Sequence, residues 1–125
     1  MIHHVQLGAP AGSEPLSRAF WSELLGFDEV AKPTDLAERG GCWFRRGQIE
    51  IHVGAEEGFR PARRAHPGLL VEDLDREAER LARAGIAVEW DDHLPGMRRF
   101  YASDPHANRL EFLQPAQHIT PNVGC

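Results

Sequence analysis

The pattern of apolar and polar positions in the first half of the chain switches between two periods. A period of two, typical of strands, gives way to apolar residues at helical spacing and then returns. Ser13 has the chemistry of a helix N-cap, and Gly26 is a typical helix terminator. The expected elements are a helix between these two residues and strands over residues 2–7, 27–30, 42–45 and 49–53. This order predicts a β-α-β-β-β module.

The second half of the chain repeats this order after a connection, residues 55–65, which has no periodicity and contains Gly58 and Pro61. Asp73 is the expected N-cap of another helix, and Gly85 is its expected terminator. Further strands are expected over residues 66–71, 86–90, 98–102 and 109–113. Because the same succession of periods occurs twice, the expected fold is α+β, with two repeated β-α-β-β-β modules whose curved sheets form a shared groove.

The length of 125 residues and an apolar fraction of 42% are typical of one domain. We expect a single domain made of module one over residues 1–54, the connection 55–65, module two over residues 66–115 and a C-terminal tail over residues 116–125.

The charge of the chain argues against several partners. Fourteen basic and 19 acidic residues give a net charge of -5, so there is no basic face for nucleic acid. No stretch approaches the roughly 20 apolar residues that span a bilayer, and the first residues do not resemble a secretory leader. We therefore expect a cytoplasmic protein without a membrane partner.

Cys42 and Cys125 are too few for a disulfide framework and are expected to be free thiols.

One histidine and one glutamate recur at similar places in the two halves. His4 and Glu50, in the first and last expected strands of module one, are 46 residues apart, whereas His66 and Glu111 in module two are 45 apart. Two imidazoles and two carboxylates suit a divalent transition metal. The alternative is that the glutamates lie on the solvent-exposed faces of their strands and that the histidines are strand residues without a functional role. The repetition favours the metal site.

Other polar residues carry weaker arguments. His3 neighbours His4 but points to the opposite strand face. His52 shares the face of Glu50, so it is either an interior histidine or a further ligand or proton carrier beside the metal. The connection holds three arginines that either are solvated or meet an anionic substrate, namely Arg60, Arg63 and Arg64.

Four motifs make the sequence resemble the vicinal oxygen chelate superfamily, which includes glyoxalase I, fosfomycin-resistance proteins, bleomycin-binding proteins and extradiol dioxygenases. The motifs are His4-Val-Gln-Leu, the AFWSELLGF segment of residues 19–27, His66-Pro-Gly-Leu-Leu-Val and Asp104-Pro-His-Ala-Asn-Arg-Leu-Glu-Phe. The last is the most specific, because an Asp-Pro-x-x-Asn turn before a strand with a central Glu is characteristic of the family's metal-ligand strand. His106 departs from the usual aromatic or small residue and is expected to affect only the turn.

The resemblance implies a ligand set and an assembly. His4, His66 and Glu111 match the three ligand places shared by much of the superfamily, and Glu50 matches the fourth place used in glyoxalase I. One divalent metal ion is therefore expected, with nickel, zinc, cobalt, iron and manganese as candidates. Because relatives form paired assemblies, a homodimer is expected, with the metal site built either within one chain or between two.

Three functions are compatible with these residues. Four ligands leave two positions on an octahedral ion for a small vicinally oxygenated substrate, which the arginines suggest is anionic. That favours a metal-dependent lyase or isomerase of the glyoxalase type, with Glu50 or Glu111 moving the proton. The alternatives are an iron-dependent extradiol dioxygenase, with Tyr101 near the iron, and a noncatalytic drug-binding protein whose groove is lined by tryptophans, namely Trp21, Trp43 and Trp90.

Overall fold

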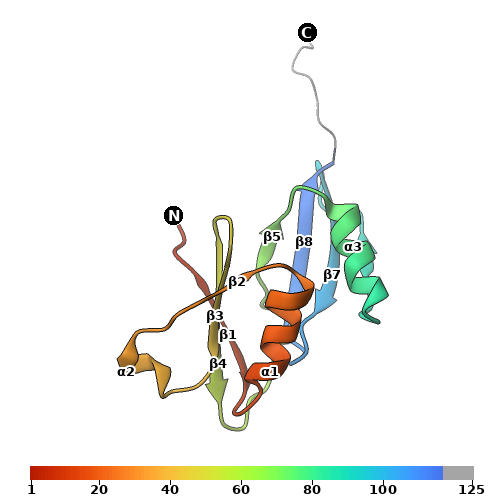
Figure 1. Cartoon of the computed structure of the whole chain (residues 1–125). Coiled ribbons are helices and arrows are strands. Elements are labelled where there is room, and N and C mark those ends of the chain that lie inside the picture. Colours follow the sequence, from red (N-terminus) through yellow and green to blue (C-terminus); the bar gives the residue numbers. More distant parts are fainter. Residues whose placement is uncertain (117–125) are drawn as a thin grey trace.

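The computed structural model describes residues 1–116, which form two four-stranded sheets and short helices (Figure 1). The elements are β1 (Val5–Pro10), α1 (Glu14–Ser17), η1 (Arg18–Leu24), β2 (Asp28–Val30), α2 (Thr34–Ala37), β3 (Cys42–Arg46), β4 (Ile49–Glu56), β5 (Gly68–Leu70), α3 (Leu74–Arg83), β6 (Glu89–Asp91), β7 (Met97–Ser103) and β8 (Arg109–Pro115). The strand orders are β1-β4-β3-β2 and β5-β8-β7-β6, and in each sheet the outer pair β1-β4 or β5-β8 is parallel. The α+β fold with two β-α-β-β-β modules and curved sheets is confirmed.

The two histidines expected in the first strand of each module lie just before those strands. β1 begins directly after His4, and β5 begins after His66 and Pro67. Proline has no backbone N–H to donate to a strand ladder, which explains the later start of β5. The strands expected over residues 2–7 and 66–71 are therefore shifted or shortened. The other expected strands correspond to β2, β3, β4, β6, β7 and β8, with β6 beginning later than expected.

The first helix changes its winding along its length. In η1 the hydrogen bonds have the longer π-helical spacing, and the N–H of Leu25 donates to the carbonyl of Phe20 at 3.0 Å. Gly26 follows with a φ of 75°, a left-handed conformation that suits glycine at a helix end. The short helix α2 lies after Pro33 in a segment expected to be a loop. Local periodicity predicted the helix between Ser13 and Gly26 but neither its π-winding nor α2.

The helix of module two has the ends that the sequence predicts. The carboxylate of Asp73 accepts a hydrogen bond from the backbone N–H of Arg76 at 3.2 Å, which is N-cap geometry. Arg80 and Arg83 lie in its last turn, where a positive charge complements the helix dipole. Gly85 follows with a φ of 81°. Among the described residues, no helix combines the length and the apolar character needed to cross a membrane.

One apolar core joins the two modules. Its fully buried side chains include Trp21 from module one and Phe100 and Phe112 from module two. Polar contacts also cross between the modules, because the side-chain amide of Asn108 donates to the carbonyl of Gly8 at 2.8 Å. Figure 1 shows α1 of module one next to the start of β8 in module two. The expected module boundaries remain a prediction, and the expected tail lies, apart from Ala116, outside the described residues.

A buried ion pair between β3 and α3 leads to a prediction about stability. The guanidinium of Arg46 donates to both oxygens of Glu77, at 3.0 and 2.8 Å, and Glu77 is only 2% exposed. Because Glu77→Ala leaves the half-buried guanidinium without its counter-ion, we expect it to lower the free energy of unfolding by about 3–5 kcal/mol. Urea titration followed by circular dichroism measures this change.

The matched control for this prediction is Glu79→Ala in the same helix. Glu79 pairs with Arg83 at 2.6 Å, but both side chains are exposed. An exposed pair at this spacing contributes less than about 0.5 kcal/mol. Equal losses of stability in the two variants would contradict the role assigned to the buried pair.

Candidate functional site

A cavity of about 720 Å³ lies between the two modules. Its walls come from β1, β4, the connection, β5 and the start of β8. Three of the four predicted ligands line it, namely His4, Glu50 and His66. Phe59 of the connection also lines it and packs so closely on β1 that a Cβ added to Gly8 would lie 2.6 Å from the Phe59 ring. The lining agrees with the expectation of a groove shared by both modules.

The first half of the candidate site gathers around β4. The carboxylate of Glu50 accepts a hydrogen bond from Nε2 of His52 at 2.8 Å and is held on its other oxygen by Arg45 at 2.9 Å. The His52 ring is stacked between the rings of His4 and Trp43, with centroid distances of 3.8 and 3.9 Å. His52 therefore contacts both candidate ligands of module one.

The surroundings of this half-site shift two pKa values. The hydrogen bond from His52, and after it the one from Arg45, lowers the pKa of the Glu50 carboxyl group. Burial lowers the pKa of the His52 imidazole, and the nearby carboxylate of Glu50 only partly opposes this effect. At neutral pH the pair therefore consists of a carboxylate and a neutral imidazole, which is the ligand form of histidine.

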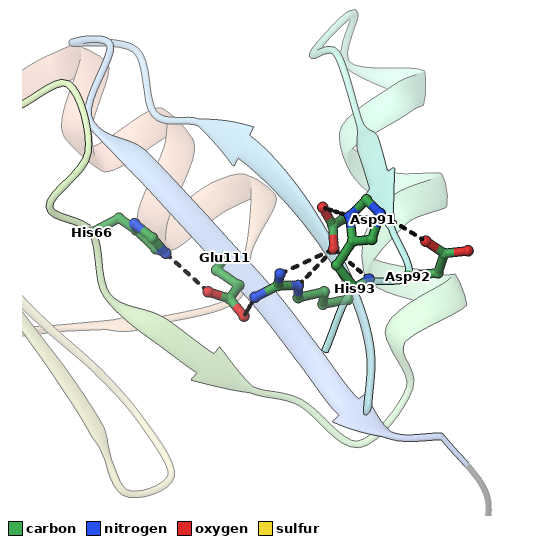
Figure 2. Close-up of polar contacts among 6 residues, drawn as sticks. His66, Asp91, Asp92, His93 and Glu111 are labelled. Carbon is green, nitrogen blue, oxygen red and sulfur yellow. Dashed lines mark hydrogen bonds and ion pairs between the residues drawn. The ribbon is translucent and has the colours of Figure 1, made fainter. Parts of the chain in front are cut away.

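The second half of the candidate site lies on β8, and Figure 2 shows it. Nε2 of His66 lies 2.9 Å from one carboxylate oxygen of Glu111, and Arg99 donates to the other oxygen at 3.1 Å. The polar contacts continue with an ion pair from Arg99 to Asp91 at 3.0 Å and a contact from Asp91 to Nδ1 of His93 at 3.3 Å. Glu111 is buried, and both of its oxygens are occupied. The expected proximity of His66 and Glu111 is present in the structure.

Strand register relates the two half-sites in a way that sequence spacing did not predict. In module one, the residue opposite Gln6 of β1 is His52, and in module two the residue opposite Gly68 of β5 is Glu111. Gln6 and Gly68 each follow the histidine of their module by two residues. In the repeated unit, His52 therefore takes the place of Glu111, and Glu50 lies two residues earlier on the same strand face.

The His4–Glu50 spacing of 46 residues resembles the His66–Glu111 spacing of 45 residues, although Glu50 and Glu111 are not at equivalent positions. The reason is that the segment from the histidine to the end of the first helix is longer in module one. Gly26 comes 22 residues after His4, whereas Gly85 comes 19 residues after His66. Counted from these glycines, His52 and Glu111 are each 26 residues further on. Counting residues from Gly26 and Gly85, rather than from the histidines, would have identified His52 as the counterpart of Glu111.

The four predicted ligands do not converge within one chain. Among residues 1–116, no three His, Cys, Asp or Glu side chains gather closely enough to hold a metal ion. Their chemistry nevertheless fits a divalent transition metal, because each half-site supplies imidazole and carboxylate groups. The structure thus contains two pairs of candidate ligands, and the prediction that Glu50 is the fourth ligand stays a prediction.

The expectation that His106 affects only its turn is wrong. The ring of His106 is buried, and its Nε2 lies 2.8 Å from the hydroxyl of Ser17 in module one. The turn directs the ring inward because Asp104 accepts hydrogen bonds from the backbone N–H groups of His106 and Asn108, each at 2.9 Å. His106 is therefore a contact between the modules.

The aromatic and thiol candidates have other roles than a groove lining. The indole of Trp21 is part of the core, Trp43 stacks on His52, and Trp90 is 50% exposed and packs against Phe100. The expected lining of the groove by three tryptophans is thus not found for the cavity between the modules.

Cys42 is a buried free thiol, and its burial raises the pKa of the thiol to about 11. Cys125 lies outside the described residues.

Comparisons with known proteins agree with this architecture. A protein from Bacillus anthracis assigned to the glyoxalase family is 47% identical in sequence, with a TM-score of 0.89 over 92% of this chain and 94% of that one. The antibiotic-binding protein TnmS3 from Streptomyces is 22% identical, with a TM-score of 0.71 over 93% and 98% of the two chains. The fosfomycin resistance protein FosX from Listeria monocytogenes is 14% identical, with a TM-score of 0.72 over 93% of each chain. The two distant structures support the fold alone.

No curated protein sequence matches the chain. The family model of the Glyoxalase/Bleomycin resistance protein/Dioxygenase superfamily, however, matches residues 2–112, which include both half-sites. The chain therefore belongs to the Glyoxalase/Bleomycin resistance protein/Dioxygenase superfamily.

Proposed function

We propose that the protein is a metal-dependent lyase or isomerase of the glyoxalase type, which moves a proton on a small vicinally oxygenated substrate. The observation that carries this proposal is the repeated half-site. A histidine just before the first strand and a second side chain that can bind metal on the parallel neighbouring strand occur in both modules at the same register. All four of these side chains can bind a divalent metal, which supports a metal site built from both modules.

Four side chains would hold the metal ion in this proposal. Module one contributes His4 and, by register, His52, and module two contributes His66 and Glu111. Glu50 accepts the hydrogen bond of His52 at 2.8 Å, which is the usual way in which a carboxylate orients a ligating histidine. A divalent metal bound there would act as a Lewis acid that stabilises negative charge on a substrate oxygen.

We infer that the two halves of the site come from different chains of a homodimer. Within one chain the half-sites stay apart, and β1 and β5 are edge strands, each with a hydrogen-bonded neighbour on one side only. Exposed apolar side chains lie beside both edges, with Ile2 at 78% and Leu70 at 61% exposure. Pairing module one of one chain with module two of another covers these side chains and brings the two half-sites together.

Glu50 is the carboxylate best placed to move the proton. It accepts a hydrogen bond from the proposed ligand His52 without being one of the four proposed ligands itself, whereas Glu111 is one of those four. Glu50 is ionised at neutral pH, but the hydrogen bonds that lower its pKa also make it a weak base. Glu50 would therefore accept a proton only from a carbon next to a carbonyl that a bound metal ion has made more acidic. Release of that proton to the neighbouring carbon or oxygen completes an isomerisation without loss or gain of electrons.

Solvent deuterium exchange tests this role. Protein reconstituted separately with nickel, zinc, cobalt, iron and manganese is given hemithioacetals and hydroxyketo acids in deuterium oxide. We expect deuterium incorporation without oxygen consumption, and a loss of at least about 100-fold in the exchange rate in Glu50→Gln. Glu56→Gln, at the exposed end of the same strand, is the control and should exchange at the normal rate.

Metal affinity of Glu50→Gln separates two roles of this residue. If Glu50 acts as the base, the variant keeps its metal affinity within about tenfold, because the amide oxygen still accepts the hydrogen bond of His52. A loss of metal binding comparable to that of a ligand variant would make Glu50 itself the fourth ligand, as the sequence spacing predicts. Unchanged exchange rates in the variant would contradict its role as the base.

One observation favours the dioxygenase as a second candidate. The ring of Tyr101 contacts the ring of His66 edge to face, with centroids 5.4 Å apart, so a phenol group lies beside the candidate metal site. The same reconstituted samples distinguish the two functions. Consumption of oxygen by the iron form with catechols, without deuterium incorporation, would replace the isomerase with the dioxygenase.

A further inference from the structure

Arg109 differs from the other half-buried arginines of the described chain. Five arginines are half-buried between residues 1 and 116, and four of them face a carboxylate. The four are Arg46 and Arg80 with Glu77, Arg98 with Asp75, and Arg99 with Asp91 and Glu111. The side chain of Arg109 has neither an ion pair nor a hydrogen bond within this range, and its buried Nε atom has no partner. A half-buried charge without a counter-ion is costly, so the structure lacks a partner for this group.

The guanidinium of Arg109 is held in place by an aromatic ring rather than by an acid. Its Cζ atom lies 4.1 Å from the centroid of the Tyr101 ring, a cation–π contact. Stacking on one face leaves the in-plane N–H groups free, and these groups are the ones that bind a planar anion. The contact thus orients the cation without neutralising it.

The position of Arg109 places this cation in the proposed site. It lies two residues before Glu111, on the same face of β8, so it belongs to the module-two half of the proposed site, and like His66 it lines the 720 Å³ cavity. It also lines a second cavity of about 320 Å³, which Arg63 and Glu89 line as well, although Glu89 forms no ion pair with Arg109. In the structural repeat, Arg109 occupies the place that Glu50 has in module one. A positive group in one module thus corresponds to the proposed base in the other.

We propose that Arg109 binds the carboxylate of the substrate, so that the protein acts on small 2-hydroxy or 2-oxo acids. This inference rests on the proposed function and specifies its substrate class. The guanidinium fork matches the two oxygens of a carboxylate, and one unpaired cation matches one negative charge. Arg99 is not available for this task because Asp91 and Glu111 occupy it. Of the connection arginines, Arg60 lines the same cavity but is exposed.

Binding of simple probes tests the inference. Glycolate, its neutral amide glycolamide and methylphosphonate are titrated into the full-length protein, metal-free and nickel-loaded, and followed by NMR chemical shifts. We expect Arg109→Met to weaken glycolate binding by about 10- to 100-fold, because a charge-assisted pair is lost, and to leave the weaker glycolamide binding unchanged. Arg109→Lys should recover part of the affinity, since it restores the charge but not the fork.

A matched control is Arg98→Met. Arg98 is also half-buried and lies over an aromatic ring, 5.2 Å from the centroid of Trp90, but it pairs with Asp75 and does not line the cavity between the modules. This variant should bind glycolate normally, and thermal denaturation of both variants checks that they fold. Equal glycolate affinity in wild type and Arg109→Met overturns the inference, as does equal binding of glycolate and glycolamide by the wild type.

Two further results would also overturn it. Tighter binding of methylphosphonate than of glycolate would make the ligand a phosphonate or phosphate rather than a carboxylate. A shift of Arg109→Met toward monomers in light scattering, with unchanged glycolate binding, would show that the partner of Arg109 is a carboxylate of a second chain. The nickel titration keeps the two proposals apart, because wild-type protein that binds glycolate but no metal contradicts the proposed function and not the role of Arg109.

Discussion

Replacing Glu111 with alanine is expected to weaken the binding of a divalent metal by at least about 100-fold, which corresponds to about 2.7 kcal/mol. Glu111 is buried, and its carboxylate oxygens lie 2.9 Å from Nε2 of His66 and 3.1 Å from Arg99. In the proposed site, this substitution would remove one of the four ligands and leave the positive Arg99 facing the metal ion. Nickel and zinc titrations by calorimetry, on protein purified without chelator, measure the change.

Two further variants make this metal prediction specific. Glu111→Gln keeps the volume and separates loss of the charge from loss of packing, and it should also bind metal weakly. Glu56→Ala removes an exposed carboxylate of β4 and should bind metal like the wild type. If wild type and Glu111→Ala bind nickel and zinc equally, the metal site is not where we place it.

Mixing two inactive variants is expected to restore part of the metal binding. His4→Ala damages module one, and His66→Ala damages module two, so each homodimer has two defective sites. In an equal mixture with free exchange of chains, half of the dimers are mixed, and each mixed dimer has one intact site. About a quarter of the wild-type number of tight sites should therefore return, if each site uses the two modules of different chains.

The matched control combines two variants of the same module. His4→Ala and His52→Ala both damage module one, so their mixture contains no intact site in any dimer and should not recover. Light scattering at micromolar concentration establishes whether the wild type is a dimer. A monomer, or the absence of recovery in the first mixture, would contradict the shared site.

Local signals in the sequence were sufficient for the order of the strands and of the two longer helical segments, but not for the short helix α2. The side chain of Asp73 accepts a hydrogen bond from a backbone N–H in the first turn of its own helix. Gly26 and Gly85 end helices because they adopt positive φ angles. The period of two in the strands likewise depends only on which face of each strand is buried. Helix winding was less predictable, because the spacing of apolar residues did not distinguish the π-turn, in which the N–H of Leu25 donates to the carbonyl of Phe20, from an ordinary helical turn.

The candidate site was predictable only in part. Nε2 of His66 lies 2.9 Å from Glu111, as the order of strands suggested, because the first and last strands of a module are parallel neighbours. Sequence spacing pointed to Glu50 as the counterpart of Glu111, whereas strand register points to His52. Register depends on hydrogen bonds between β1 and β4, which are distant in the sequence. The helical segments of the two modules differ in length, so counting residues across them placed the counterpart of Glu111 two positions too early, at Glu50 instead of His52.

By itself, the sequence determined the two repeated modules, the ligand-competent residues in each module and, through its motifs, the family. Each of these depends on local periodicity or on a short motif. Only the tertiary structure decided that the half-sites stay apart within one chain, that His106 joins the modules, and that Arg109 lacks a counter-ion among the described residues. Those features depend on which strands pair and which side chains meet across the core, and long-range contacts of this kind leave no periodic trace in the sequence.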